Sequence, residues 1–200
     1  AQSALKSALD VSGLDYYSET GEAAFYGPKA DFMARDVLGR EWQLSTIQVD
    51  FIQPSKLGLT YHGEDAQEHT PVVLHRAVTG STERFLGVLI EQYAGAFPLW
   101  LAPVQVVLIP ITDRNLEYCQ KIHTILQDNG LRTNIDAGNE RMNSKIRKAQ
   151  VHKVPYMLII GDKEEQNQAV SVRSRSGENI GQITLKEFVA LTSEKIAIDK

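Results

Sequence analysis

The stretch His75–Val107 reads HRAVTGSTERFLGVLIEQYAGAFPLWLAPVQVV, and the organisation of the whole chain follows from it. Gly80 permits a sharp turn, because a glycine adopts positive φ without strain. Ser81 or Thr82 can then cap the first turn of a helix. The apolar run that begins at Phe85 predicts a buried helix of about three turns.

Two prolines behind this helix predict a domain boundary. Pro98 and Pro103 bracket the apolar sequence LWLA, so the link between domains should be short, stiff and packed down. Beyond it the pattern changes to strands that alternate with helices. We therefore expect a first domain at residues 1–101 and a second at residues 102–200.

Arg84 stands in the first turn of the predicted helix, where a cation interacts unfavourably with the helix dipole. An arginine at a helix start usually has an anion beside it, supplied by a side chain or by a ligand. The neighbouring Glu83 is the simplest partner. These residues alone favour that ion pair over a bound anion, and both alternatives stay open.

The first domain shows its clearest strand at residues 41–51, beside strands expected at 31–37 and, buried, at 71–74. The stretch 54–70 is expected to be a polar loop. Alternating side chains of a strand point to opposite faces, so one face of the long strand carries Thr46, Gln48, Asp50, Trp42 and Leu44. Such a row fits either the solvent side of an antiparallel sheet or the mixed floor of a ligand site.

The second domain alternates strands and helices, as expected for an α/β fold with a mixed, mostly parallel sheet. Cys119 lies on the apolar stripe of its first helix and should belong to the core. The expected strands cover 104–111, 131–136, 154–160 and 170–175, and the expected helices cover 115–128, 141–153 and 185–196.

Composition limits the possible functions. The net charge of −4 shows that the chain is no polycation, so RNA binding would need a local basic patch. A single cysteine excludes an internal disulfide and fits a reducing compartment. No apolar run approaches the roughly 18 residues of a membrane span, and the N-terminus is no signal peptide, so we expect a cytoplasmic protein. The start AQSALK lacks an initiator Met and continues into a helix expected at 3–12, which suggests a fragment.

Several blocks resemble one enzyme family. HRAVTGSTERF followed by GAFPLWLAPVQVV resembles motif 3 of class II aminoacyl-tRNA synthetases, and more narrowly the threonyl-tRNA synthetases. FYGPK at 25–29 and the pattern WQ-x-x-T-x-Q at 42–48 resemble further blocks of that family, and the likeness extends from about Leu14 to Ile196. It implies the C-terminal part of an antiparallel-sheet catalytic domain, followed by an α/β anticodon-binding domain. The complete enzyme would be a homodimer that activates threonine with ATP and Mg²⁺ and transfers it to tRNA(Thr).

The resemblance assigns roles to residues of the first domain. Arg84 would bind the γ-phosphate of ATP, and Tyr26 would lie beside threonine and the tRNA end, although a half-buried core aromatic is the simpler interpretation of Tyr26. The other residues placed near ATP or threonine are Lys29, Thr46, Gln48 and Ser81. Many family members have Cys-Gly where this chain has Leu44-Ser45, so no role of that cysteine transfers.

His75 matches the last of three zinc ligands in the family, and the other two would lie upstream of this chain. By itself, a histidine at the end of an apolar strand is more often a hydrogen-bonded core residue. The metal makes chemical sense, because an apolar pocket separates threonine poorly from valine. A zinc ion with an open coordination position can bind the amine and the β-hydroxyl of threonine, and valine lacks that hydroxyl.

In the second domain the resemblance points to a face that reads anticodon bases by their Watson–Crick edges. A solvated basic helix at 141–153 is the simpler interpretation from the residues alone. The residues that the resemblance assigns to this face are Asn139, Arg147, Lys153, Glu164 and Arg173.

Two functions are compatible with the sequence. One is the C-terminal portion of a threonine–tRNA ligase, which would be inactive by itself without motifs 1 and 2. The alternative is a non-catalytic tRNA-binding or regulatory paralogue built from the same domains. A degenerate paralogue would tend to lose Gln48, His75 or Arg84, and all three are present, which favours the ligase.

Overall fold

The computed structural model describes residues 1–199, which form two compact units, one of residues 1–88 and one from residue 89 onward. The division falls inside α3 (Thr82–Tyr93). The predicted boundary after residue 101 stays a prediction. Each unit is described by itself below.

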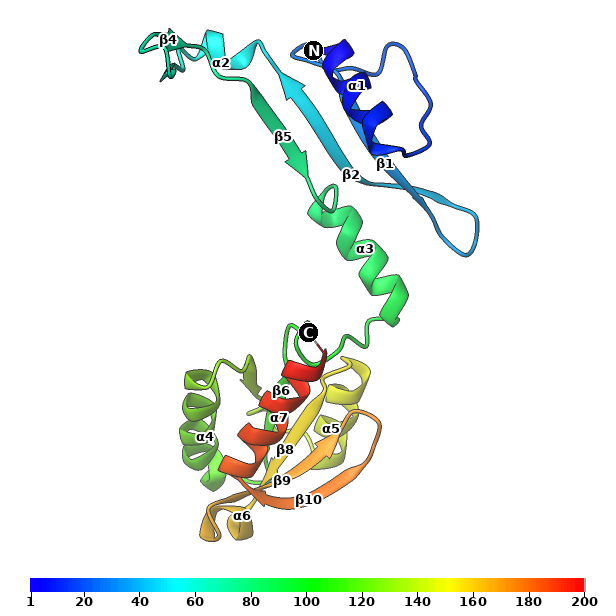
Figure 1. Cartoon of the computed structure of the whole chain (residues 1–200). Coiled ribbons are helices and arrows are strands. Elements are labelled where there is room, and N and C mark those ends of the chain that lie inside the picture. The colour runs from blue at the N-terminus through cyan, green and yellow to red at the C-terminus, as the bar shows by residue number, and fades with distance from the viewer. Residues whose placement is uncertain (200) are drawn as a thin grey trace. The chain divides into compact units, whose positions relative to one another are not determined.

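The first unit contains a three-stranded antiparallel sheet in the order β1-β2-β5 (Figure 1). Its strands are β1 (Lys29–Arg35), β2 (Glu41–Asp50) and β5 (Val73–Ala77). The predicted N-terminal helix is confirmed as α1 (Gln2–Ser12), and it ends at Gly13 with φ of 68°. The left-handed conformation after a helix is one that glycine adopts without cost.

A tight turn at residues 36–40 joins β1 to β2. Gly39 has φ of 79°, and one oxygen of Asp36 accepts the N–H groups of Leu38 and Arg40, both at 2.9 Å. The other oxygen accepts Nε1–H of Trp42 at 3.0 Å. These donors, with that of Trp42 the largest, lower the pKa of Asp36 to about 2. The turn is therefore held by a carboxylate that stays ionised in all but strong acid.

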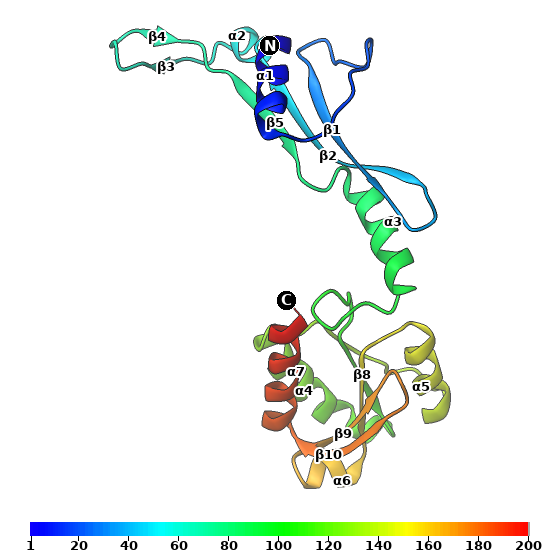
Figure 2. The ribbon, with the colours of Figure 1, turned by 45° about the vertical axis from the view of Figure 1, so that its right-hand side comes forward.

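The prediction of a polar loop at 54–70 is wrong in part. The segment contains α2 (Gln53–Lys56) and a small hairpin of β3 (Tyr61–His62) and β4 (Glu68–His69), visible in Figure 2. Pro54 suits the first turn of a helix, where its missing N–H is not needed. Asp65 closes the hairpin, because its carboxylate accepts the N–H of Gln67 and contacts Nε2 of His69 at 2.9 Å.

Two predicted buried elements are exposed instead. The strand expected at 71–74 begins two residues later as β5, and its central residues are exposed. The helix α3 forms as predicted but has no buried residue, and Phe85, Leu86 and Ile90 are 36%, 47% and 47% exposed. An apolar stripe shows which face of a helix is suited to packing. It does not show whether another segment of this chain packs against that face.

The second unit is built on a five-stranded sheet in the order β10-β9-β8-β6-β7. Four strands run in one direction and β9 runs in the opposite one, which confirms the expected mixed, mostly parallel sheet. The edge strand β10 and its hairpin with β9 were not predicted. The strands are β6 (Val106–Pro110), β7 (Thr133–Ile135), β8 (Tyr156–Ile160), β9 (Ala169–Ser174) and β10 (Asn179–Thr184).

Helices cover both faces of this sheet (Figure 1). The helices α4 (Leu116–Asp128) and α7 (Leu185–Asp199) pack on one face, where Leu108, Leu158 and Phe188 are fully buried. The helix α5 (Met142–Val151) packs on the other. A short 3₁₀ turn, η1 (Asp113–Asn115), and the unpredicted α6 (Asp162–Gln166) follow β6 and β8.

Cys119 on α4 is 0% exposed, which confirms its predicted place in the core, and burial raises the pKa of its thiol to about 12. Among residues 1–199 no helix is long and apolar enough to cross a bilayer.

Candidate functional site

One face of the first sheet gathers the polar residues that the sequence singles out. Directly paired residues of antiparallel strands share a face. Gln48 pairs with Lys29 on one side and with His75 on the other, and Thr46 pairs with Asp31. The predicted row on β2 is therefore confirmed for Thr46, Gln48 and Asp50, and it extends across three strands. The prediction is wrong for Trp42 and Leu44, because the register with β1 skips Leu44 and brings Gln43, which donates to Thr46, onto this face instead. The face carries Lys29, Asp31, Thr46, Gln48, Asp50 and His75.

Asp31 connects two of the predicted site residues. Its carboxylate accepts Oγ1–H of Thr46 at 2.6 Å and pairs with Nζ of Lys29 at 2.8 Å. Partial burial raises the pKa of Asp31, but the bonds from Lys29 and Thr46 outweigh it, so the net shift is downward. The same contact raises the pKa of Lys29. Both groups are therefore charged at neutral pH, and the face holds a fixed ion pair that sequence reasoning missed.

Gln48 anchors the loop that carries Tyr26. Its side chain is 8% exposed, and Nε2 donates to the carbonyl of Gly27 at 3.3 Å. A Cβ at Gly27 would lie 1.7 Å from the carbonyl oxygen of Val49, so this position requires glycine. Tyr26 is half-buried, and the centroid of its ring lies 5.4 Å from that of His75. The loop is thus pressed onto β2 beside the polar face.

His75 is not a core residue. Its side chain is 44% exposed, and Nε2 lies 2.9 Å from Oδ2 of Asp50. Asp50 is 0% exposed, and its other oxygen accepts the N–H groups of Ile52 and Gln53, both at 2.9 Å. Burial raises the pKa of Asp50, but His75 and the two backbone donors outweigh it, so the pKa is lowered overall. The sequence placed Asp50 on this face but gave it no role.

Arg84 and Ser81 lie at the start of α3. Oγ of Ser81 accepts the N–H of Arg84 at 3.1 Å, which confirms Ser81 as a helix cap, and Gly80 before it has φ of 72°. The guanidinium of Arg84 donates to the carbonyl of Gln43 at 2.7 Å. The ion pair with Glu83, which the residues alone favoured, is wrong, because the side chain extends back along β2 instead.

In the second unit, four of the five predicted RNA-facing residues lie around α5. Arg173 on β9 pairs with Met157, which packs against α5, so Arg173 is on the side of the sheet that α5 covers. Arg147 is exposed on α5 itself. Asn139 and Lys153 are exposed just before and just after α5. The helix is basic and solvated, as the simpler interpretation expects, and Arg173 beside it extends the charge onto the sheet.

Glu164 has structural partners instead of a free carboxylate. One oxygen accepts the N–H of Gly161 at 3.0 Å, and the other accepts Oγ–H of Ser171 at 2.8 Å. The first bond caps α6 at its start. An ionised carboxylate has further lone pairs, so these bonds orient Glu164 without excluding a ligand.

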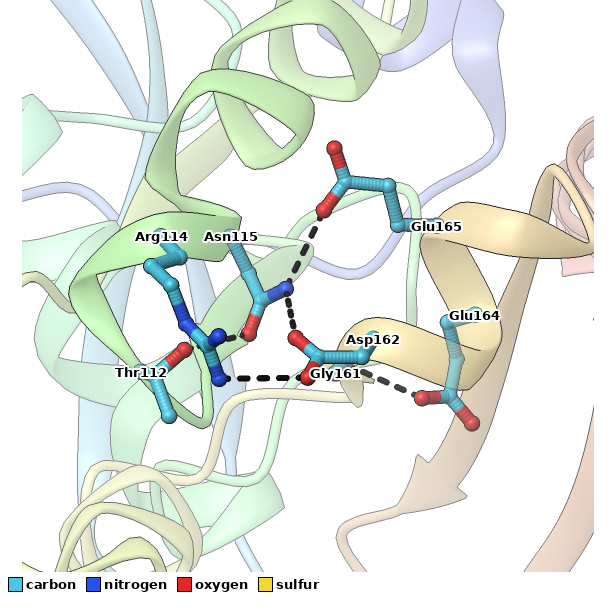
Figure 3. Close-up of polar contacts among 7 residues, drawn as sticks. All are labelled: Thr112, Arg114, Asn115, Gly161, Asp162, Glu164 and Glu165. Carbon is cyan, nitrogen blue, oxygen red and sulfur yellow. Dashed lines mark hydrogen bonds and ion pairs between the residues drawn. The ribbon is translucent and has the colours of Figure 1, made fainter.

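Figure 3 shows a polar cluster close to Glu164 that the sequence analysis did not find. Asn115 is 1% exposed, and its amide nitrogen donates to Asp162 at 2.9 Å and to Glu165 at 3.1 Å. Its oxygen accepts Oγ1–H of Thr112 at 2.9 Å, and Arg114 pairs with Asp162 at 3.2 Å. The cluster connects the segments that follow β6 and β8. It therefore holds α6, and Glu164 with it, in place.

No group of three or more histidine, cysteine, aspartate or glutamate side chains within residues 1–199 is arranged to hold a metal ion. His75 would therefore supply a single ligand to a metal site. Its exposure fits that role, because an exposed imidazole can coordinate a metal ion together with ligands that the described residues do not supply.

Two family models match successive parts of the chain. Residues 4–93 match the model of the tRNA synthetase class II core domain (G, H, P, S and T). Residues 105–195 match the model of the anticodon binding domain.

The relatives carry one name. The chain is 57% identical over 198 residues to the threonine–tRNA ligase of Rubrobacter xylanophilus, and 50% identical over 197 residues to that of Alkalilimnicola ehrlichii. Each match covers 98% of this chain and 31% of the relative, so the chain spans about a third of their length. A crystal structure of the RNA binding domain of threonyl-tRNA synthetase from Cryptosporidium parvum superposes with a TM-score of 0.75 at 37% identity, covering 98% of this chain and 50% of that one. The chain therefore belongs to the threonyl-tRNA synthetases and corresponds to their C-terminal part, the end of the class II core domain followed by an anticodon-binding domain.

Proposed function

We propose that the protein to which this chain belongs is a threonine–tRNA ligase that activates threonine with ATP and transfers it to tRNA(Thr). The observation that carries the proposal is the polar face of β1, β2 and β5, where Lys29, Gln48 and His75 are cross-strand neighbours. We place the site for threonine and ATP on this face, and the match to the class II core domain supports that position.

The first half-reaction forms a bond from the threonine carboxylate to the α-phosphate of ATP and breaks the bond to pyrophosphate. Negative charge develops on phosphate oxygens, so fixed cations and Mg²⁺ lower the barrier. Arg84 contributes the cation for the γ-phosphate. One of its nitrogens is engaged by Gln43, and a guanidinium carries five N–H donors in all. Its remaining donors are available to an anion, and Ser81 fixes the helix start that positions it.

The floor residues position the substrates. Gln48 and Thr46 are held by Gly27 and by Asp31, so their side chains present a fixed surface to threonine and ATP. Lys29 adds a positive charge close to them, oriented by Asp31. Tyr26 stands beside His75, where it would contact the bound threonine and the end of the tRNA. Pre-oriented groups of this kind cost no reorganisation during the reaction.

His75 fits one ligand of a zinc ion that selects threonine by its amine and hydroxyl groups. Its imidazole is exposed, and Asp50 engages one of its two nitrogens. A metal-binding histidine with its second nitrogen bound to a carboxylate is a frequent arrangement. The remaining ligands would come from outside the described residues.

The second unit would bind the anticodon of tRNA(Thr). Asn139, Arg147, Lys153 and Arg173 present donors around α5, and Glu164 presents an acceptor held by the cap of α6. Splayed bases are read by such side chains along their Watson–Crick edges. We further infer that the complete protein acts as a homodimer in the cytoplasm, as its family suggests.

The test is threonine-dependent exchange between ATP and pyrophosphate by the full-length protein, followed by charging of tRNA(Thr). Activity in both assays supports the proposal. A protein that binds tRNA but shows no ATP–pyrophosphate exchange would be the non-catalytic paralogue. The polar face would then have no catalytic role.

A further inference from the structure

Asp50 is a buried carboxylate with both of its oxygens committed. Its side chain is 0% exposed, one oxygen accepts two backbone N–H groups, from Ile52 and Gln53, and the other faces Nε2 of His75 at 2.9 Å. A buried aspartate that only terminated a strand would need the backbone donors alone. The second oxygen is used to hold an imidazole that is itself 44% exposed.

The contact fixes which imidazole nitrogen carries the proton. A carboxylate that receives two backbone N–H groups acts as an acceptor, so Nε2 of His75 is the donor in the third bond. In a neutral imidazole the other nitrogen, Nδ1, then has a free lone pair. Asp50 is on the buried side of the ring, so Nδ1 is the nitrogen left for a partner outside the described residues.

We propose that Asp50 is a positioning residue, which orients His75 and fixes its tautomer so that Nδ1 binds the zinc ion. This inference rests on the proposed function, because it needs a metal at His75. It goes beyond that function by assigning the metal-binding atom and by giving the buried carboxylate a task. Outer carboxylates of this kind typically change metal affinity about 10- to 100-fold when they are removed.

The variant Asp50→Asn separates positioning from folding. An asparagine has the same shape, and its amide oxygen can still accept the N–H groups of Ile52 and Gln53. Its amide nitrogen then faces Nε2 of His75 and donates to it, which moves the imidazole proton to Nδ1. Nδ1 can then bind a metal only after it gives up this proton, which weakens binding. The backbone contacts survive, and only the tautomer is reversed.

The experiment uses the full-length protein as wild type, Asp50→Asn, His75→Ala and Asp36→Asn. Asp36 is the matched control, because it is also a hydrogen-bonded aspartate of the first unit. It lies in the β1–β2 turn and does not contact His75. Zinc affinity is measured by competition with a chromophoric chelator, and the visible spectrum of the Co²⁺-loaded protein reports ligand geometry. Exchange kinetics with threonine and with valine supply KM and kcat separately.

We expect Asp50→Asn to lower zinc affinity about 10- to 100-fold and to alter the Co²⁺ spectrum. The KM for threonine should rise more than kcat falls, and Asp36→Asn should leave the zinc affinity unchanged. Wild-type affinity and spectrum in Asp50→Asn would overturn the inference while leaving the zinc proposal intact. A wild-type protein that binds no zinc, or a His75→Ala variant that keeps it, would remove the metal proposal and this inference together.

A structure of the zinc-loaded wild-type protein tests the same inference if Asp50→Asn fails to fold. Zinc at about 2.0–2.1 Å from Nδ1 of His75 supports it. Zinc on Nε2 overturns it, because that nitrogen could not then donate to Asp50.

Discussion

Gln48 on β2 and His75 on β5 are direct cross-strand partners, so both side chains emerge on one face of the first sheet. The same register places Lys29 on the other side of Gln48. Three blocks that are separated by up to 46 positions in the chain, from Lys29 to His75, thus form a single surface. The proposed site is therefore formed by the pairing of distant strands and not by a local sequence motif.

Arg84→Ala in the full-length protein should lower threonine-dependent exchange about 100-fold, because one donor to developing phosphate charge is lost. The control is Arg35→Ala, which removes an exposed arginine that pairs only with Glu41 at the sheet surface. Such surface pairs contribute little, so the control should keep wild-type exchange. A loss below about threefold for Arg84→Ala would contradict its role at the γ-phosphate.

Gly27→Ala should reduce exchange by about 10- to 100-fold. The added Cβ would lie 1.7 Å from the carbonyl oxygen of Val49, so the loop must move away from β2. Gln48 donates to the carbonyl of Gly27, and Tyr26 directly precedes Gly27, so both side chains shift with the loop. Steady-state exchange kinetics measure the loss. Unchanged kcat and KM for threonine would show that this loop does not position the substrate.

The alternation of residues 41–51 predicted that Thr46, Gln48 and Asp50 share a face, because a strand has a period of two. It could not show the register shift at Leu44, which breaks this period and places Gln43 instead of Trp42 on that face. It could not supply the partners of that face. Asp31 binds Thr46, and Asp50 binds His75, through pairings with β1 and β5 that depend on register between distant segments. The ion pair and the buried carboxylate were missed for this reason.

Short elements escaped prediction for a different reason. The hairpin of β3 and β4 has two residues in each strand, and α6 has five residues, too few for a periodic pattern to appear. The buried strands β6 and β8 were found because every residue in them is apolar and buried, so that they stand out as continuous apolar runs. The exposure of α3 could not be foreseen, since its apolar stripe is the same whether or not another segment covers it.

Arg173→Ala should weaken charging of tRNA(Thr), with little change in ATP–pyrophosphate exchange. The residue lies on β9 in the second unit, beside α5, whereas the residues proposed to bind ATP belong to the first unit. The control is Lys121→Ala. Lys121 lies on α4, which packs on the opposite face of the sheet, and its side chain pairs with Glu117. Charging assays at several tRNA concentrations should show a raised KM for tRNA in Arg173→Ala alone. Equal losses of exchange and charging would indicate damage to folding.

Cys119 should resist alkylation in the folded protein. Burial raises the pKa of its thiol to about 12, so the thiolate that reacts with iodoacetamide is scarce even at pH 9. Because the shift is upward, the thiolate stays a very small fraction of the native thiol at both pH 7 and pH 9, so labelling of the native chain should be slow at both. Denaturant exposes the thiol and returns its pKa to the usual range, so labelling should then be rapid and should rise with pH. Mass spectrometry of the chain counts the label, and fast native labelling at pH 8 would contradict the buried position.

The segment before β6 should stabilise the second unit when that unit is produced alone. Leu99 is 3% exposed, and its carbonyl accepts Nε2–H of Gln105 at 2.8 Å. Arg132 donates to the carbonyls of Trp100 and Ala102. A piece of residues 104–200 has the complete sheet with helices on both faces and should fold, but it lacks these contacts.

A piece of residues 96–200 should therefore unfold at a higher urea concentration than residues 104–200. Burying one leucine side chain contributes about 1.5–3 kcal/mol, which is a large part of the stability of a small domain. Circular dichroism is the right probe, because Trp100 is present in only one of the pieces. Leu99→Ala in the longer piece should remove much of the difference, since such truncations cost about 2–5 kcal/mol. Equal urea midpoints for the two pieces would show that the segment from Phe97 to Pro103 does not belong to the second unit, and would favour a boundary after it.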